Sequence, residues 1–192
     1  MSKARKETDE ELMQLLRSGD SSGLDGLFRR YYDSLCRLSL RIIKDADSAE
    51  DVVQEFFLSV WKKRNVLPEI DLVAPYLKRS VRNRSLNFLR DQKRIPTGEE
   101  SELPVLATTK EWASEKIELE ELRERVDLAI NSLPERCRLI FVLHKFGGMK
   151  QKEIAVALNI SVKTVENQMG RAYQHLRSLL SAILLFGVIG GG

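Results

Sequence analysis

Histidine and cysteine are scarce in this sequence, and their scarcity argues against several kinds of site. The 192 residues contain two Cys and two His, which do not cluster with the spacing of a zinc-binding motif. Cys36 and Cys137 fall within apolar helical patterns, so we expect buried thiols rather than a disulfide or a metal site. The sequence also shows no phosphate-binding loop and no nucleophile–base pair, so we expect no cofactor and no enzymatic activity.

Long hydrophobic runs are missing as well. Residues 1–11 are charged, unlike a signal peptide. The apolar C-terminal tail, residues 182–192, is far shorter than the roughly 20 residues that span a bilayer. Its simplest interpretation is a helix end that packs on its own domain, and the alternative is that it docks a partner. We therefore expect a cytoplasmic protein that does not insert into the membrane.

Charge is nearly balanced over the whole chain but not along it. The net charge is +3. Residues 76–94 contain seven Lys or Arg against one Asp, and residues 134–180 contain eight against three Glu. Between these basic segments, residues 99–124 contain nine Glu against three Lys or Arg. Two basic modules that flank an acidic connector predict two contacts with a polyanion.

Strand signals are almost absent, whereas helical periodicity is nearly continuous. Proline, glycine and acidic residues interrupt it after residue 94. We predict an all-α fold of two small helical domains, residues 1–94 and 115–192, joined by a flexible acidic linker over residues 95–114. The side chains expected to open the helices of the first domain are Thr8 with Glu11, Ser21 or Ser22, Ser48 with Asp51, and Pro75. The helix after the linker is expected to pack through Leu119, Leu122, Val126, Ala129 and Leu133.

The last quarter of the chain carries the pattern of a helix-turn-helix. Residues 150–158 predict a short helix, residues 159–161 a tight turn in which Ser161 caps the next helix, and residues 162–180 a longer helix. An apolar stripe marks one side of the longer helix. The other side carries groups that bind base edges and phosphates, namely Lys163, Thr164, Asn167, Gln168, Arg171 and His175. We predict that this helix binds duplex DNA, and the alternative is a helical hairpin with a solvated polar face.

The expected fourth helix, over residues 75–93, is basic on one side. Arg79, Arg82, Asn83 and Arg90 share a face by their spacing, while apolar residues such as Leu77 can face the core. A basic helix is often only a solvated surface. Here a second basic module follows in the same chain, which favours contact with nucleic acid.

The expected third helix combines acidic and aromatic residues. Acids gather at its start, where they suit the helix dipole, and Phe57 and Trp61 lie off its main apolar stripe. A polar face with aromatic anchors favours a protein-binding helix. A metal site formed by Asp45, Asp47 and Glu50, or a plain solvated surface, are the alternatives. The candidate protein-binding residues are Glu50, Asp51, Gln54, Glu55, Phe57 and Trp61.

Three segments, taken in order, resemble a bacterial RNA polymerase sigma factor of the extracytoplasmic-function (ECF) type of the sigma-70 family. Residues 49–61, AEDVVQEFFLSVW, resemble the family's helix that binds the clamp helices of the polymerase beta-prime subunit. Residues 76–90, YLKRSVRNRSLNFLR, resemble its helix that reads and opens the −10 promoter element. LPERCRLIF at residues 133–141, followed by QKEIA at residues 151–155, resembles the domain that binds the −35 element. The resemblance covers nearly the whole chain.

This resemblance implies an alternative sigma factor that binds core RNA polymerase, at the beta-prime clamp helices and the beta flap, and directs initiation at promoter DNA. It also implies a linker near the RNA exit path and control by a membrane-bound anti-sigma factor. It places Asn83 in the pocket region for an unpaired base, and Asn87 where the family usually has Asp. The residues assigned to the −10 element are Arg79, Arg82, Asn83, Asn87, Arg90, Lys93 and Arg94, and those assigned to the −35 element are Lys150, Lys163, Thr164, Asn167, Gln168 and Arg171.

Two other functions stay open at this level. A conventional helix-turn-helix regulator would bind DNA as a dimer without loading polymerase, and it would not need the acidic-aromatic helix of residues 50–61. A nucleic-acid enzyme would use the carboxylates near residue 47 with a metal ion, and Asp47→Ala would abolish its nuclease activity.

Overall fold

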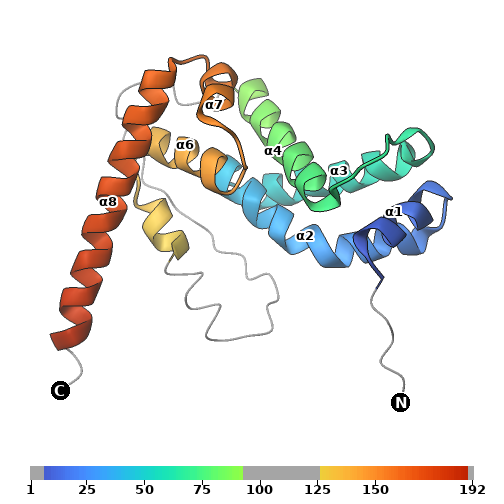
Figure 1. Cartoon of the computed structure of the whole chain (residues 1–192), viewed down its shortest axis with the longest axis horizontal. Coiled ribbons are helices and arrows are strands. Elements are labelled where there is room, and N and C mark those ends of the chain that lie inside the picture. Colours follow the sequence, from blue (N-terminus) through green and yellow to red (C-terminus); the bar gives the residue numbers. More distant parts are fainter. Residues whose placement is uncertain (1–6, 93–125, 190–192) are drawn as a thin grey trace. The chain divides into compact units, whose positions relative to one another are not determined.

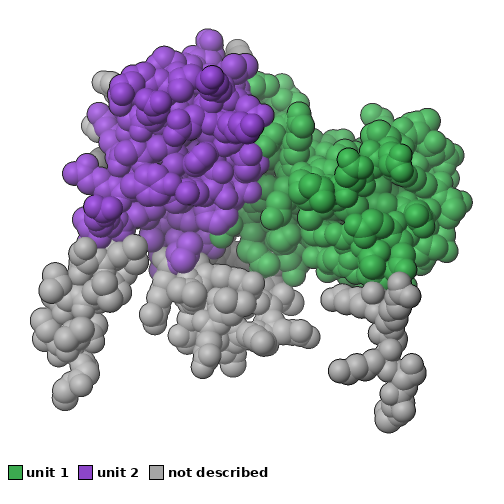
Figure 2. Space-filling view, viewed as in Figure 1, with its two compact units in different colours: residues 1–93, 108–110 green, residues 94–107, 111–192 purple. Residues whose placement is uncertain are grey.

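The computed structural model describes residues 7–92 and 126–189, with side chains described up to residue 179 (Figure 1). All regular elements in these ranges are helices, which confirms the expected all-α class. The chain divides into two compact units, residues 1–93 with 108–110 and residues 94–107 with 111–192 (Figure 2). The predicted acidic linker lies outside the described residues.

Unit 1 is built around its longest helix, α2. This helix packs against α1, α3 and α4, and α3 also packs against α4. Leu12 and Leu16 of α1, Leu35 of α2, Val53 of α3 and Val81 of α4 are fully buried between these helices. The elements are α1 (Asp9–Arg17), α2 (Ser21–Ile43), α3 (Ala46–Lys62), the short 3₁₀ helix η1 (Arg64–Val66) and α4 (Val73–Asp91).

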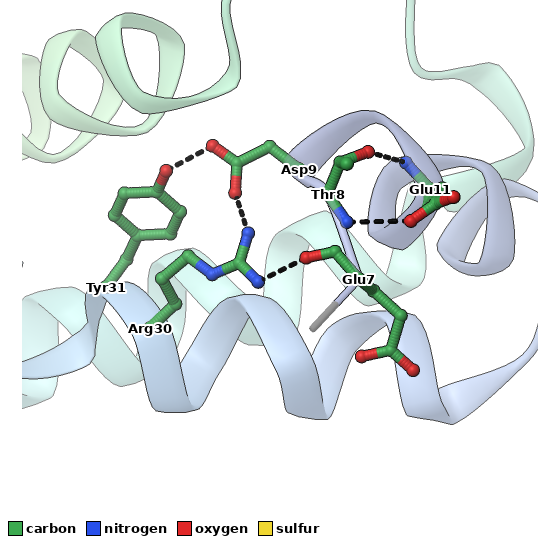
Figure 3. Close-up of polar contacts among 6 residues, drawn as sticks. All are labelled: Glu7, Thr8, Asp9, Glu11, Arg30 and Tyr31. Atoms are coloured by element: carbon green, nitrogen blue, oxygen red, sulfur yellow. Dashed lines mark hydrogen bonds and ion pairs between the residues drawn. The ribbon is translucent and has the colours of Figure 1, made fainter. Parts of the chain in front are cut away.

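The first two helices approach each other closely because α2 has a glycine at the contact. A Cβ atom on Gly23 would lie 2.4 Å from both the Leu12 carbonyl oxygen and the Leu16 amide nitrogen. Polar contacts fix the same pair of helices from the side (Figure 3). Arg30 forms an ion pair with Asp9, which also accepts a hydrogen bond from the Tyr31 hydroxyl. Burial, with Asp9 beside it, raises the pKa of Tyr31 to about 12, so the hydroxyl keeps its proton.

Two of the expected helix starts are wrong in detail. The capping box of Thr8 and Glu11 is confirmed, with hydrogen bonds in both directions (Figure 3). Asp20, rather than Ser21 or Ser22, caps α2 by accepting from the Ser22 amide at 2.9 Å. Asp45, rather than Ser48, caps α3. Aspartate caps as well as serine does. Only two residues, the left-handed Lys44 and Asp45, separate α2 from α3, so α3 begins earlier than expected.

Pro75 does lie in the first turn of α4, as expected, although the helix begins two residues earlier at Val73. A proline is tolerated in that turn because its missing N–H would have no helical partner there. The turn that precedes α4 leaves Val66 and Leu72 exposed.

Unit 2 packs one long helix against two shorter ones. Residues 126–131 are helical, followed by α6 (Glu135–Lys145), α7 (Gln151–Leu158) and α8 (Val162–Ile189). α8 packs on α6 and α7 through the buried residues Val165, Met169 and Ala172, as the apolar stripe predicts. Leu133 is buried as expected. Val126 was expected to pack as well but is 42% exposed, and Ile130, one turn later, is buried instead. Leu119 and Leu122 lie outside the described residues.

Both cysteines are buried thiols that form no disulfide in the described residues, as predicted. Burial raises the pKa of the Cys36 thiol to about 12, so it is an unreactive core group. In the ranges described, no helix combines the length and apolar character needed to cross a membrane. The apolar side chains of the C-terminal tail are outside the described part.

Candidate nucleic-acid and polymerase interfaces

The helix-turn-helix of unit 2 has the predicted local geometry. α7 ends at Asn159, whose φ of 54° and ψ of 51° lie in the left-handed region that asparagine tolerates. Ser161 then caps α8, because its hydroxyl oxygen accepts a hydrogen bond from the Thr164 amide at 3.0 Å. Ala155 of α7 is buried, α7 packs against α8, and a small side chain in α7 suits a close crossing of the two helices. The turn therefore gives α7 and α8 the local geometry of a helix-turn-helix, with α8 as its second helix.

The polar face of α8 separates into exposed and internally bonded residues. Lys163, Asn167 and Arg171, spaced four residues apart, are exposed along one line of the helix. Gln168 is half-buried and accepts a hydrogen bond from the Cys137 thiol of α6, while His175 contacts the Ser132 hydroxyl at 3.2 Å. The structure thus brings three of the predicted −35 residues together on an open surface. Thr164 is half-buried beside Ser161, and Lys150 is exposed at the start of α7.

The exposed face of α4 differs by one residue from the face that its spacing predicts. Arg79, Asn83, Asn87 and Arg90 are exposed along one side of the helix. Arg82 is 8% exposed, so the expectation that it shares this open face is wrong. Its position is turned toward the side of the helix that carries the buried Val81 and Ser85, and a long arginine can extend from there toward the helix edge. Lys93 and Arg94 lie outside the described residues.

Hydrogen bonds link the arginines of α4 to neighbouring polar groups. The Arg82 guanidinium donates from Nε and Nη2 to Asn83 Oδ1, at 3.2 and 3.0 Å. Arg90 Nη1 donates to Asn87 Oδ1 at 3.2 Å. Arg84 donates to the Ser59 hydroxyl of α3 at 2.6 Å, and its guanidinium lies over the Phe56 ring. Arg84 therefore joins α4 to α3, a role that the basic pattern alone does not reveal.

The exposed face of α3 differs from the predicted one in its apolar residues. Phe57 is 3% exposed and packs against Phe28 and Phe56, so the prediction that it is an exposed anchor is wrong. The helix buries a broader stripe than a single line because it lies against both α2 and α4. Trp61 is half-buried under the Arg64 guanidinium, 4.3 Å from the ring centroid.

A different apolar residue lies among the acids of this face. Leu58 is 56% exposed, one turn after the exposed residues Gln54 and Glu55. Gln54 also contacts the hydroxyl of Tyr32 from α2 at 3.4 Å, which adds α2 to the surface. Sequence analysis missed Leu58, although its spacing from Asp51 and Glu55 places it on their face. Asp51 and Glu55 are exposed, and Glu50 is half-buried.

One carboxylate of the proposed metal site, Asp45, has a structural role at the start of α3. Asp45 Oδ1 accepts from the Ser48 amide at 2.8 Å and caps the helix. Among the residues that the structure describes, no three His, Cys, Asp or Glu side chains are grouped so as to hold a metal ion.

Comparison with known proteins identifies the two units. The family model for sigma-70 region 2 matches residues 27–95, which include α3 and α4. The model for sigma-70, region 4, matches residues 123–176, which include α6, α7 and the first half of α8. The chain belongs to the sigma-70 family. The resemblance seen in the sequence is confirmed, and in the order expected.

Relatives of similar length identify the type of sigma factor. The RNA polymerase sigma-H factor of Pseudomonas aeruginosa is 26% identical over 191 residues, covering 93% of this chain and 97% of that protein. The ECF RNA polymerase sigma-E factor of Escherichia coli is 28% identical over 185 residues, covering 92% and 96%. The solved structure of CnrH in complex with the cytosolic domain of CnrY is 25% identical, has a TM-score of 0.50 and covers 91% of this chain and 97% of CnrH.

This sigma factor is of the ECF type. As a member of this family it is an alternative sigma factor that directs transcription initiation, and its partners are core RNA polymerase and promoter DNA. The conventional helix-turn-helix regulator is thereby excluded, because region 2 is present in addition to the DNA-binding region 4.

Proposed function

We propose that this sigma factor binds polymerase through the exposed face of α3 and contacts the promoter through α4 and α8. The observation that carries the proposal is the different chemistry of these faces. The exposed face of α3 presents acids around an exposed leucine, whereas α4 and α8 present arginine, lysine and amide groups. The proposed domains are residues 1–94 for polymerase and the −10 element and residues 115–192 for the −35 element, with residues 95–114 as linker. The chain contributes recognition, and the polymerase contributes the chemistry.

The α3 face has the composition of a protein-binding surface. Leu58 is a central apolar group, and Asp51, Gln54 and Glu55 form a polar rim around it. Interfaces are commonly built this way, with the apolar centre supplying most of the affinity and the charged rim supplying orientation. We assign this surface to the clamp helices of the beta-prime subunit. The beta flap is assigned to unit 2 by family membership.

The two DNA faces suit different forms of DNA. In α8 the exposed Lys163, Asn167 and Arg171 lie on a recognition helix, which fits the major groove of the −35 duplex. In α4 the exposed amides Asn83 and Asn87 suit an unpaired base of the −10 element, with Arg79 on the backbone. Two weak contacts in one chain reinforce each other, because the second is made at a high effective concentration.

A regulatory partner is also part of the proposal. The similar structure of CnrH contains a second protein, the cytosolic domain of CnrY. We infer that a comparable protein holds this sigma factor away from polymerase until a signal releases it. The site of action is the cytoplasm, where core polymerase works.

The test of the polymerase interface is capture of purified bacterial core RNA polymerase by variants of the full chain. Asp51→Lys with Glu55→Lys reverses two exposed charges on α3, and Leu58→Asp removes the apolar centre. The matched control reverses two exposed charges on other helices, Glu10→Lys with Asp25→Lys. We expect the control to bind like the wild type and both α3 variants to lose binding by at least about tenfold, the scale of a central interface residue. Equal binding by all four proteins would overturn the assignment of α3.

A further inference from the structure

Arg82 is buried, unlike the other arginines of α4. Asn83, to which it donates hydrogen bonds, is exposed. Its guanidinium directs both Nε and Nη2 at one atom, Asn83 Oδ1. We propose that Arg82 is a positioning residue, which fixes the Asn83 amide so that this side chain offers only N–H donors to DNA. This inference depends on the proposed role of Asn83 at the −10 element.

The orientation of the amide follows from chemistry. A guanidinium carries five N–H donors and no acceptor, so only the oxygen of the Asn83 amide can face it. The distances of 3.2 and 3.0 Å are those of ordinary hydrogen bonds. With its oxygen held by two donors, Asn83 must direct its NH₂ group elsewhere. Asn83 is exposed, so that group is available to a ligand.

Burial makes the arrangement more than a chance surface contact. Arg82 is 8% exposed, between residues that are fully buried such as Val81 and Ser85. Taking hydrogen bonds away from a buried charged group is costly, so the amide oxygen is held in place. The side chain is also poorly placed to meet a phosphate directly. The structure therefore replaces the expected DNA contact of Arg82 with an indirect one.

A fixed amide changes which bases Asn83 can read. A free asparagine pairs with adenine through both of its polar atoms, accepting from N6 and donating to N7. With Oδ1 occupied, that pairing is closed. The remaining NH₂ group suits a base edge with neighbouring acceptors, such as N7 and O6 of guanine or O2 and N3 of an unpaired cytosine. We infer that Asn83 selects guanine or cytosine and disfavours adenine.

Arg90 and Asn87 provide a built-in comparison on the same helix. Arg90 donates from Nη1 to Asn87 Oδ1 at 3.2 Å, and both residues are exposed. An exposed bond of this kind exchanges readily with water and holds its partner weakly. Removing Arg90 should therefore reduce attraction to phosphates for every sequence, without changing the choice of base at one position.

The experiment is selection of DNA by the holoenzyme formed from core polymerase and the full chain. The probe is a fork-junction promoter library in which the nontemplate −10 strand is randomised, and the readout is the base preference at each position after sequencing. The variants are Asn83→Ala, Asn83→Asp, Arg82→Met and Arg82→Lys, with Arg90→Met as the matched control. A thermal unfolding curve for each variant shows whether it is folded.

We expect Asn83→Ala to remove the preference at one position, which identifies the base that this residue reads. At that position Arg82→Met should reduce discrimination against adenine by at least about fivefold, since the released amide can then pair with adenine. Arg82→Lys, which keeps the charge and one donor, should retain part of the discrimination. Asn83→Asp presents only acceptors and should shift the preference toward bases with an amino group.

Three outcomes distinguish the positioning role of Arg82 from the −10 role of Asn83 on which it rests. If Asn83→Ala changes no position, the proposed −10 role of Asn83 is wrong. If Asn83→Ala removes a preference but folded Arg82→Met and Arg82→Lys leave that preference intact, the positioning role of Arg82 is wrong. If Arg82→Met and Arg90→Met both lower binding to all sequences equally, Arg82 is an ordinary phosphate-attracting charge, and the inference is again overturned.

Discussion

The two helices assigned to DNA, α4 and α8, present their polar groups in opposite ways. On α4 both exposed amides are bonded to arginines of the same helix. On α8 the exposed Lys163, Asn167 and Arg171 extend into solvent, with one long contact from Lys163 to Glu166 at 3.5 Å. A group that is fixed before binding loses less entropy when it binds and discriminates more sharply. Such groups suit a single unpaired base, whereas flexible cations suit the repeated phosphates of a duplex.

The contacts that hold the two helices in their units also differ, since α4 uses directional polar contacts and α8 uses apolar ones. α4 is held partly by polar contacts, which include the buried bond of Ser85 with Ser39 of α2 at 3.0 Å and the half-buried bond of Arg84 with Ser59 of α3 at 2.6 Å. The first half of α8 is held by the apolar side chains Val165, Met169 and Ala172. Directional polar contacts fix the rotation of a helix, while an apolar stripe tolerates small adjustments. The difference can be tested by removing each kind of support.

The largest effect is expected from the apolar support of α8. Met169→Ala should lower the free energy of unfolding of unit 2 by about 2–5 kcal/mol, because it removes a buried side chain and leaves a cavity. Hydrogen exchange of the full chain measures this unit by unit. Amides of α4 should keep their protection, and binding to −35 duplex should fall with the stability of unit 2.

Gly170→Ala is the matched control for this change. It lies beside Met169 on the same helix, and a Cβ there meets no atom within 4 Å. Alanine favours a helix over glycine by roughly 0.5–1 kcal/mol, so unit 2 should become slightly more stable. A loss of stability at residue 170 equal to that at residue 169 would show that α8 is sensitive to any change and not to its apolar stripe.

The next effect concerns the polar support of α4, and it should depend on which serine is removed. The Ser85 hydroxyl also donates to the Val81 carbonyl at 3.0 Å, so it keeps a partner when Ser39 is changed. Ser39→Ala should therefore cost less than Ser85→Ala, which strands the buried Ser39 hydroxyl and should cost about 1–3 kcal/mol. Denaturant unfolding of the two single variants and the double variant measures the order. If the double variant is as unstable as the sum of the singles, the pair is not coupled.

These contrasts show how far the sequence alone reaches. Helical periodicity predicts α8 and its apolar stripe because one face meets one set of neighbours, and the structure confirms Val165, Met169 and Ala172 as buried. The same reasoning misplaces Phe57 and Arg82. Phe57 is covered by Phe28 of α2, a tertiary neighbour that a helical pattern does not contain. Arg82 is buried although it is charged, and its burial depends on packing that the spacing of basic residues does not show.

The exact residue at which a helix begins is also difficult to predict from the sequence. α3 begins at Ala46 rather than near Ser48 because an aspartate at the end of a short connection takes the cap. That connection reflects the length of α2, which is set by the packing of unit 1. Motif and charge could thus predict which helices carry exposed basic and amide groups, while the orientation of the amides required atomic contacts.

A smaller effect should separate the forms of DNA that the two helices bind. Arg171→Ala on α8 should reduce the slope of log affinity against log salt by about 0.9, the value for one phosphate of duplex DNA. Arg79→Ala on α4 should reduce it by about 0.7, the value for a single strand. Both residues are exposed. Salt titrations of holoenzyme on a labelled promoter measure the slopes, and an unchanged slope for either variant would remove that residue from the DNA surface.

The smallest effect on stability is expected at the ion pair of the recognition helix. Lys163 and Glu166 have side-chain exposures of 77% and 46% and are 3.5 Å apart, so Glu166→Gln should change the free energy of unfolding by less than about 0.5 kcal/mol.

The effect of Glu166→Gln on DNA binding should be larger than its effect on stability. The change removes an acid from the basic face and releases Lys163 for a phosphate, so affinity for −35 duplex should rise a few-fold at low salt and less at high salt. A matching substitution cannot be made within α4, because α4 contains no acidic residue before Asp91. A fall in affinity after Glu166→Gln would mean that Glu166 accepts a hydrogen bond from a base, and that α8, like α4, reads DNA with a fixed polar group.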